Sequence, residues 1–296
     1  MKKKSISILL PTYHCDCVAL VSALQRQCIE NETDFEIIVA DDGSTDKSFV
    51  RKNEAIEKLS GVRYIKRKEN VGRSAIRNFL IHQSTKEWLI FIDGDLSLHN
   101  PHFIINYLKA RGEVVIGGIN IGGDEETWKN NLRYRYEKAY ERNSNVQTRQ
   151  KEACQHFRTT NFMARRKAME LCKFDENFKR YGYEDVLLGK AFEENNIPLT
   201  HIHNPITLEE FENNDLFLQK TEESLETLAA FRRQLKGYST LLRTAEKIEK
   251  LHCRGLFVCF FRLTKNLFKK HLKHNKSSIF LFNVYKLMYF LQIEHR

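Results

Sequence analysis

Short apolar runs alternate with helix-length amphipathic stretches through the first 120 residues, and this alternation strongly constrains the fold. Five runs have the length and composition of strands: Ile6–Leu10, Phe35–Ala40, Val62–Lys66, Trp88–Ile92 and Val114–Ile116. Helical patterns fill the spaces between them, over Cys17–Glu30, Asp46–Leu59, Ser74–His82 and Pro101–Lys109. Such alternation predicts an α/β fold with a doubly wound, mostly parallel sheet and helices on both faces.

Ligands of such sheets bind outside the carboxyl ends of the strands, so the residues that follow each strand are the functional candidates. Polar, acidic or glycine-containing clusters stand at four successive strand ends. In chain order they are Pro11-Thr12-Tyr13, Asp41-Asp42-Gly43-Ser44, Glu69-Asn70-Val71-Gly72-Arg73 and Asp93-Gly94-Asp95. Solvation of a loop does not require this chemistry at every strand end, and the agreement favours a ligand site.

The Asp93-Gly94-Asp95 cluster predicts a cation site. Residues i and i+2 of an extended segment project to the same side, so both carboxylates can face one ion, while Gly94 lets the backbone pass close to it. Carboxylates together with phosphate oxygens and water suit Mg²⁺ or Mn²⁺. The alternative is an acidic turn that caps the next helix, but the position after an apolar strand favours the metal.

The second and third clusters suit a nucleotide. Asp41 or Asp42 can accept hydrogen bonds from ribose hydroxyls or a base N–H, while Asp46 suits a helix N-cap. The segment from Asn70 through Gly72 leads into a helix that contains Arg77, and a helix N-terminus favours phosphate. The alternative for both clusters is an ordinary capped turn.

Two later segments carry further candidates. Glu184-Asp185 opens a helical pattern over Glu184–Glu194, and a carboxylate there can act as general base toward an acceptor hydroxyl. A helix N-terminus lowers a carboxylate pKa, so the surroundings would have to raise it; the alternative is a pair of acids that complements the helix dipole. His201-x-His203 has strand spacing and can place one imidazole on the metal, or can be packed or surface histidines. Arg165 and Arg166 are either solvated charges or partners of a diphosphate.

The charge is uneven along the chain. The net charge is +10, but residues 231–296 hold fifteen Lys/Arg against three Asp/Glu, which leaves the rest near neutral. A neutral body argues against nucleic-acid binding, and a basic tail indicates an anionic partner. Seven cysteines without a C-x-x-C pair indicate a reduced, cytoplasmic compartment. We expect a catalytic domain over 1–210 and a helical, basic extension over 211–296.

The basic tail contains two apolar segments. Leu256–Leu272 has apolar side chains at roughly helical spacing opposite Lys and Arg, and Ile279–Leu291 is apolar except for Asn283 and Lys286. Both are shorter than the roughly 20 residues of a membrane span. They predict peripheral association with an anionic surface at the inner face of the cell membrane, or else aromatics that pack on the catalytic body.

These segments resemble the inverting family-2 glycosyltransferases of the GT-A fold, which are common in bacterial polysaccharide assembly. The matching motifs keep the family's order over about residues 5–203. They are S-I-L-L-P-T-Y, E-I-I-V-A-D-D-G-S-T-D, E-N-V-G-R-S-A-I-R-N, F-I-D-G-D, T-T-N-F-M-A-R and G-Y-E-D-V-L-L-G. The resemblance implies transfer of a sugar from a nucleotide-diphosphate donor, commonly a UDP-sugar, to a hydroxyl of a saccharide or lipid-linked saccharide.

The resemblance also implies roles for individual positions. The donor nucleotide would contact Pro11, Thr12, Tyr13, Asp41, Asp42, Asn70, Gly72, Arg77, Asp93 and Gly94. The metal would bind Asp95 with Asp93, and Thr160 and Asn161 would line the donor sugar or acceptor. Glu184 and Asp185 match the family's acidic pair, whose aspartate is the usual base. Related sequences often carry a histidine where Thr207 and Leu208 stand here, so His203 is the substitute candidate for the metal.

Two other classes of function compete with this one. A metal-dependent nucleotidylyltransferase also uses an α/β fold and acidic pairs, but it needs a glycine- and basic-rich phosphate loop after the first strand, where Pro11-Thr12-Tyr13 stands. A non-catalytic protein that binds membranes or nucleic acid would not need acidic clusters at its strand ends, since they repel phosphate when no metal is present.

Overall fold

The computed structural model describes residues 4–274 and 278–293. These form two compact units, each of which uses separate parts of the chain. Unit 1 takes the described residues up to Gly122 together with Ser144–Lys179 and Glu184–Glu209. Unit 2 takes Gly123–Asn143, Arg180–Tyr183 and the described residues from Glu210 onward. The domain boundary expected at residue 210 stays a prediction.

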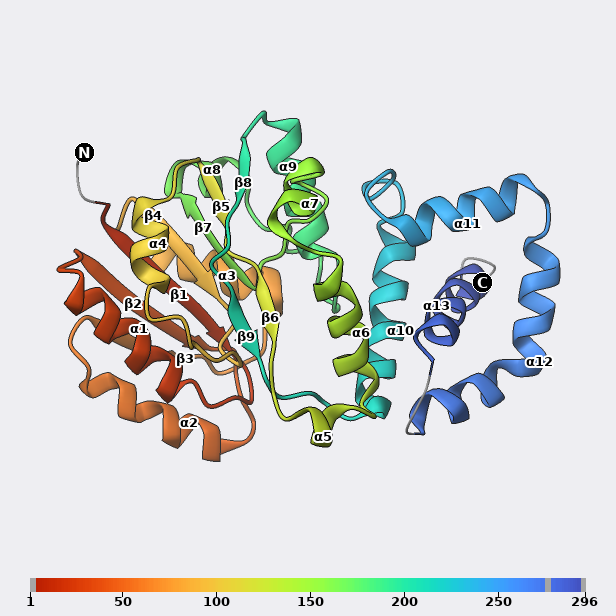
Figure 1. Ribbon diagram of the computed structural model, residues 1–296, viewed down its shortest axis with the longest axis horizontal. Coiled ribbons are helices and arrows are strands. Elements are labelled where there is room, and N and C mark those ends of the chain that lie inside the picture. The colour runs from red at the N-terminus through yellow and green to blue at the C-terminus, as the bar shows by residue number, and fades with distance from the viewer. Residues whose placement is uncertain (1–3, 275–277, 294–296) are drawn as a thin grey trace. The chain divides into compact units, whose positions relative to one another are not determined.

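Unit 1 is built on a seven-stranded sheet in the order β3-β2-β1-β4-β7-β5-β8 (Figure 1). Its strands are β1 Ile6–Thr12, β2 Phe35–Asp41, β3 Val62–Lys66, β4 Trp88–Ile92, β5 Val114–Ile116, β7 Asn161–Arg165 and β8 Leu199–His201. All neighbouring pairs are parallel except those of β7, which runs antiparallel to β4 and β5. The amino end of β7 therefore lies at the same edge as the carboxyl ends of β1, β2 and β4.

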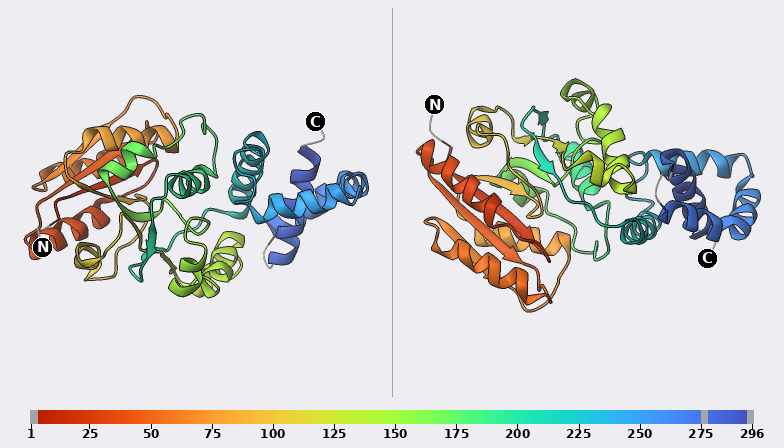
Figure 2. Two further views of the ribbon diagram at one scale, coloured as in Figure 1. Left: turned by 90° about the horizontal axis from the view of Figure 1, so that it is seen from above. Right: turned by 60° about the horizontal axis from the view of Figure 1, so that its bottom comes forward.

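Helices cover both faces of this sheet, and α1 and α3 lie on opposite sides of it (Figures 1 and 2). The helices of unit 1 are α1 Val18–Glu30, α2 Lys47–Asn53, α3 Arg73–Gln83, α4 Phe103–Lys109, α7 Val146–Lys151, α8 Arg166–Leu171 and α9 Glu184–Glu194, with a 3-10 turn over Glu54–Lys58. This is the doubly wound, mostly parallel architecture that the sequence predicts.

The strands are apolar on both faces because both faces are buried. Leu9 and Phe91 point into the core that includes Ile76 of α3 and Leu188 of α9, while their neighbours along the strands project to the other face. The Phe91 ring stacks on Phe162 of β7, with ring centroids 4.6 Å apart. Packing of this kind fixes the strand ends from which the site is built.

A small second sheet extends one edge of the site. Strand β6, Ile119–Ile121, pairs in parallel with β9, Ile206–Leu208. Ser97 also pairs with Thr207, through Ser97 N–H to Thr207 O at 2.8 Å and Thr207 N–H to Ser97 O at 3.0 Å. The chain just beyond Asp93-Gly94-Asp95 is therefore held against the segment that follows the histidines.

Most differences between the predicted and observed elements concern short or late segments. Strands β3, β4 and β5 and helix α9 have the predicted bounds. The helix expected over Asp46–Leu59 ends at Asn53 and continues as a 3-10 turn. Strands β6 and β9 were not predicted, because their pairing joins segments that lie far apart in the chain.

Unit 2 is helical. It contains α5 Glu125–Trp128, α6 Leu132–Arg142, α10 Asn214–Ala230, α11 Thr240–Lys250, α12 Arg254–Lys273 and α13 Ile279–Ile293. Within this unit, α13 is enclosed by α10, α11 and α12 (Figure 1). Its buried Tyr285 donates a hydrogen bond to Glu222 of α10, and its Lys286 lies 4.5 Å from the ring centre of Tyr136 on α6. Among the described residues, no helix has the length and apolarity needed to cross a membrane.

Candidate active site

The candidate site lies where the carboxyl ends of β1, β2 and β4 meet the amino end of β7. Ile92, the last residue of β4, pairs with Asn161, and the Asp93 N–H donates to Thr160 O at 3.2 Å. The antiparallel course of β7 therefore brings the predicted Thr160 and Asn161 beside Asp93, although nearly 70 residues separate them in sequence. The sequence alone did not predict this strand orientation.

Asp93 forms an ion pair with the buried Arg77 of α3. Arg77 Nη2 lies 2.5 Å from Asp93 Oδ1, and its Nη1 donates to Arg73 O at 3.1 Å. The guanidinium is among the largest fully buried side chains of the described residues. A buried cation is costly unless a carboxylate compensates it, so this pair fixes the position of Asp93 and offsets its charge.

Asp95 has a different environment, because it is exposed while Asp93 is partly buried. Between them, Gly94 N–H donates to Pro11 O at 3.3 Å. A Cβ added at Gly94 would lie 2.4 Å from Thr12 Cγ2, so only glycine allows this close approach of β4 to β1.

A divalent cation fits this arrangement if the donor supplies part of its shell. Within residues 4–274 and 278–293, no three His, Cys, Asp or Glu side chains converge on one metal position. Mg²⁺ commonly binds proteins through one or two carboxylates, with substrate phosphates and water completing the shell. The exposed Asp95 and the second oxygen of Asp93 match that pattern.

The adjacent Asp41 and Asp42 at the end of β2 are both buried and hold loops in place. Asp41 accepts from the backbone N–H of Ser44 at 2.9 Å and from its hydroxyl at 2.5 Å. Asp42 accepts from the N–H groups of Val71 at 3.0 Å and Gly72 at 3.1 Å. Burial raises the pKa of Asp42, although these two N–H groups oppose that shift. Contact of either carboxylate with a nucleoside stays a prediction.

The loop after β1 presents an aromatic surface that sequence reasoning described only in part. Tyr13 is exposed and stacks on His14, with ring centroids 4.0 Å apart. His14 has a positive φ of 51° and its Nε2 accepts from the Thr45 N–H at 2.9 Å. His14 was not among the predicted residues, since a single loop histidine carries no pattern. The stacked rings offer a flat surface on which the nucleobase of a nucleotide can stack.

The acidic pair Glu184-Asp185 belongs to the same edge. Glu184 Oε1 lies 3.5 Å from Arg73 Nη1, and Arg73 directly follows the Gly72 N–H that binds Asp42. Because Arg73 O also accepts from Arg77, a continuous set of contacts joins Asp42, Glu184 and Asp93. Convergence of the acidic side chains on one ligand pocket stays a prediction.

Asp185 has the electrostatic environment of a base. Its Oδ1 accepts from the Val186 N–H at 2.7 Å, and Arg158 and Arg73 favour its charged form. Burial and the neighbouring Glu184 nonetheless outweigh these effects and raise the pKa of Asp185 to about 6. A helix N-terminus lowers the pKa of a carboxylate, but desolvation of Asp185 raises its pKa by more than this effect lowers it.

Asn161 is positioned as part of the scaffold. Its Nδ2 donates to Gly118 O at 2.8 Å and Asn204 O at 2.9 Å, and its Oδ1 accepts from the Tyr107 hydroxyl at 2.6 Å. Both amide protons are thus used inside the protein. A contact of Asn161 with the donor sugar or acceptor stays a prediction.

The two predicted histidines have different surroundings. His201 is buried beside Arg149, 3.1 Å from its guanidinium, and burial lowers the pKa of His201 to about 4. His203 is exposed. An extended strand would place both histidines on one side, but β8 ends at His201, so this alternation does not reach His203. Its role as a metal ligand stays a prediction.

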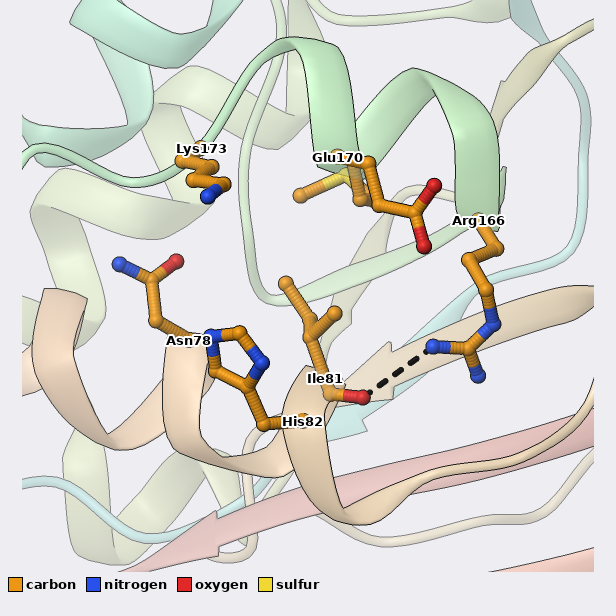
Figure 3. Close-up of a pocket in the computed structure, with 7 residues that line it drawn as sticks. Asn78, Ile81, His82, Arg166, Glu170 and Lys173 are labelled. Atoms are coloured by element: carbon orange, nitrogen blue, oxygen red, sulfur yellow. Dashed lines mark hydrogen bonds between the residues drawn. The ribbon is translucent and has the colours of Figure 1, made fainter.

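Arg165 and Arg166 lie at the opposite edge of the sheet. Arg165 pairs in register with Trp88, the first residue of β4, and forms ion pairs with Glu87 and Glu113. Arg166 donates to Ile81 O at 3.2 Å and lines a hollow of about 230 Å³ between α3 and α8 (Figure 3). These contacts exclude both arginines from the diphosphate end, a question that the sequence left open.

Comparison with protein families identifies the chain. The model of glycosyl transferase family 2 matches residues 7–172, more than half of the chain. This chain belongs to glycosyl transferase family 2. The matched region contains all four strand-end clusters, whereas Glu184-Asp185 lies outside it.

Relatives of the family-2 chain include curated bacterial proteins. It is 34% identical over 98 residues to an uncharacterized glycosyltransferase of Haemophilus influenzae, covering 32% of this chain and 38% of that protein. It is 29% identical over 127 residues to the poly(ribitol-phosphate) β-N-acetylglucosaminyltransferase TarP of Staphylococcus aureus, covering 40% of this chain and 38% of TarP. The chain thus spans well under half the length of these relatives.

Solved structures share the fold of this family-2 chain. A mannosyltransferase of Pyrobaculum calidifontis in complex with GDP-Man and Mn²⁺ matches with a TM-score of 0.57 and 12% identity, over 99% of this chain and 86% of that one. Residues 1–349 of S. aureus TarS in complex with UDP-GlcNAc match with a TM-score of 0.54 and 15% identity, over 99% and 91%. At such identities the likeness supports the fold alone.

We expect Gly94→Ala to destabilise the family-2 unit by about 1–3 kcal/mol, because the new methyl group overlaps Thr12 Cγ2. Thr12→Ser removes that carbon and should recover part of the loss in the double variant. Urea unfolding of the two single variants and the double variant measures the coupling. Purely additive effects would show that the contact with Thr12 does not impose the glycine.

The raised pKa of Asp185 predicts a pH-dependent gain in stability for Asp185→Asn. Below the unfolded pKa, near 4, the aspartate is protonated in both states, and the native state is not penalised. Between about pH 4 and 6 the unfolded aspartate ionises while the buried one keeps its proton, so the wild type loses stability, and above about 6 the loss is complete. The asparagine variant should therefore become relatively more stable over this range, by about 1 kcal/mol once the partial exposure of Asp185 is allowed for.

Urea midpoints of wild type and Asp185→Asn between pH 4.5 and 8 test this expectation. Glu170→Gln, on the exposed surface of α8, reports the effect of removing a solvated carboxylate. A constant difference between wild type and Asp185→Asn across that range would contradict the desolvated environment of Asp185.

Proposed function

We propose that this chain transfers a sugar from a nucleotide-diphosphate donor, a UDP-sugar, to a hydroxyl of a saccharide or lipid-linked saccharide in cell-surface polysaccharide synthesis. The observation that carries the proposal is the set of contacts linking Asp93 to Glu184-Asp185 through Arg77 and Arg73. It joins carboxylates suited to a metal–diphosphate with a carboxylate suited to proton abstraction. Membership of glycosyl transferase family 2 supports the same reading.

The nucleotide would lie across the ends of β1 and β2. The Tyr13–His14 pair offers its stacking surface, and Thr12, Pro11 and the Asp41-Asp42 loop form the wall beside it. Asn70 and Gly72 shape the entry to α3, whose N-terminus favours the phosphates. Because Asp42 holds this loop through two N–H groups, it positions the phosphate region even without touching the donor.

Asp95 and Asp93 would hold Mn²⁺ or Mg²⁺, which when bound offsets the charge of the departing diphosphate. The chain's own contribution at this point is orientation. The Arg77 guanidinium of α3 holds the Asp93 carboxylate through their ion pair. The close approach of Gly94 to β1 sets the direction in which Asp95 projects. His203 remains the candidate for an additional ligand.

Asp185 would take the proton of the acceptor hydroxyl as that oxygen attacks C1 of the donor sugar. The bond from C1 to the diphosphate oxygen breaks on the opposite face, so a single displacement inverts the anomeric centre. A carboxylate whose pKa lies near 6 is mostly ionised at neutral pH yet more basic than a solvated one, which suits a general base. Thr160 and Asn161, which lie beside Asp93 at the start of β7, would line the donor sugar or acceptor.

The choice of a UDP-hexose or UDP-N-acetylhexosamine donor has support in the relatives. TarP is described as an N-acetylglucosaminyltransferase, and TarS residues 1–349 bind UDP-GlcNAc. The P. calidifontis structure holds GDP-Man, so GDP-sugars form the contrasting class. Mass spectrometry of slow donor hydrolysis over a panel of both classes tests the choice; turnover of GDP-sugars alone would refute the UDP assignment.

The proposed location is the cytoplasmic side of the cell, at the inner face of the membrane where lipid-linked acceptors are held. The basic character of residues 231–296 supports attraction to anionic lipid.

Asp95→Ala is expected to abolish metal-dependent turnover, since the exposed carboxylate is the residue best placed to hold the cation. Removal of metal by EDTA should have the same effect on the wild type, with recovery on addition of Mn²⁺ or Mg²⁺. Asp34→Ala, next to the amino end of β2, is the matched control and should keep full activity. Metal-stimulated transfer by Asp95→Ala would rule out the assignment.

Asp185→Asn should keep donor affinity within a few-fold of wild type while transfer falls by about 10²–10⁴. In the wild type, kcat/KM should rise with pH through about 6, because the base acts only when ionised. Glu194→Gln, at the far end of the same helix, controls for changes in α9. Undiminished transfer by Asp185→Asn would exclude Asp185 as the base.

A further inference from the structure

Helix α12 of unit 2 carries a narrow stripe of exposed large apolar side chains. Leu256, Phe260, Leu263 and Leu267 are each between 51% and 79% exposed. Their spacing of four, three and four residues places them on one line along the helix, over about 16 Å. Single exposed apolar residues are ordinary on protein surfaces, but four in one line are a feature that needs an explanation.

The opposite face of α12 supplies the packing of the unit. Val258, Phe261 and Leu272 are buried, and Phe261 lies against Tyr285 of α13 with ring centroids 5.4 Å apart. Figure 1 shows α13 on the inner side of α12. The stripe is therefore additional to the side chains that the helical core uses.

The structure assigns the two apolar segments of the tail to different environments, which the sequence did not predict. The apolar segment Ile279–Leu291 forms most of α13, with six of its side chains buried. Of the apolar residues expected to face one side of α12, Phe261 and Leu272 point into the core. The four stripe residues are the surface that remains.

The border of the stripe is basic. Helix α12 contains six Lys/Arg and no Asp/Glu. By helical geometry, the exposed Lys270 lies on one border of the stripe, whereas the exposed Arg262 lies farther round the helix, on the side of Lys269. Lys269, farther round the helix, is held by Glu222 of α10 at 2.7 Å.

An open basin of about 600 Å³ adjoins the end of the stripe. It is lined by Asp215, Asn266, Lys269, Lys270, Lys273 and His274. Lys273 pairs with Asp215 at 2.5 Å and Lys269 with Glu222 at 2.7 Å, so the three lysines of the basin meet two carboxylates. This excess of positive charge beside an apolar stripe suits an anionic headgroup whose acyl chains lie next to it.

We propose that the α12 stripe of Leu256, Phe260, Leu263 and Leu267 inserts into the surface of an anionic phospholipid bilayer, with Lys270 and the basin binding lipid phosphate. Charge decides between this occupant and a second copy of the chain. In a symmetric pairing of two α12 helices, basic borders would face one another without an acidic partner on the helix, and like charges would oppose association. An acidic lipid surface complements both the stripe and its border.

The inference stands apart from the proposed transferase activity, since it uses no residue of the candidate active site. It names α12 as the element through which the chain would reach the proposed membrane location. Because the two readouts are independent, loss of one leaves the other to be measured on the same sample.

Flotation of the full chain with vesicles tests the proposal. We expect binding to vesicles of phosphatidylcholine with phosphatidylglycerol, little binding to phosphatidylcholine alone, and weakening by salt. Leu263→Ser with Leu267→Ser should lower binding at least about tenfold. Lys270→Gln should lower it roughly fivefold, from one basic side chain near anionic lipid.

Leu171→Ser is the matched control, since Leu171 is an exposed leucine on α8 and should leave binding unchanged. Circular dichroism melting and UDP-sugar binding on each variant show that the fold and the donor site are intact. Absence of wild-type binding to anionic vesicles, or unchanged binding by the double leucine variant, would overturn the proposal. A wild-type dimer that the leucine variant converts to a monomer in light scattering would also overturn it, in favour of a protein interface.

Discussion

The buried ion pair between Arg77 and Asp93 is the interaction on which the site depends. A buried guanidinium is costly unless a carboxylate compensates it, and Asp93 at the end of β4 does so for Arg77 of α3. The backbone of Asp93 also bonds Thr160, just before β7, and Gly94 lies against β1. The ion pair thus lies where α3 meets the ends of three strands.

Carboxylates at this edge differ in what surrounds them, and the differences suit different roles. Asp93 is compensated by an arginine, Asp42 is buried and bound by backbone N–H groups, and Asp95 is exposed. Asp185 is desolvated beside another acid, so its pKa is raised. An enzyme that needs a metal ligand and a base at one pH must separate carboxylate environments in this way.

The two apolar segments of the helical unit differ in how much of their surface is buried. Helix α13 is apolar around most of its circumference and is enclosed by its neighbours, while α12 divides its apolar residues between an inner face and an exposed stripe. The angular arrangement of the apolar residues explains the difference, because a helix can bury only the side that meets another element.

The βα alternation, the bounds of β3, β4 and β5, and the clusters at the strand ends could be predicted from the sequence, because they follow from local periodicity and from chain direction in a parallel sheet. Three features could not be predicted in this way: β7 runs antiparallel and brings Thr160 to Asp93, Asn161 donates its amide protons to Gly118 and Asn204, and His201 is buried while His203 is exposed. These outcomes depend on contacts between residues far apart in the chain, and such contacts are settled by how whole elements pack rather than by any pattern that a short segment can display.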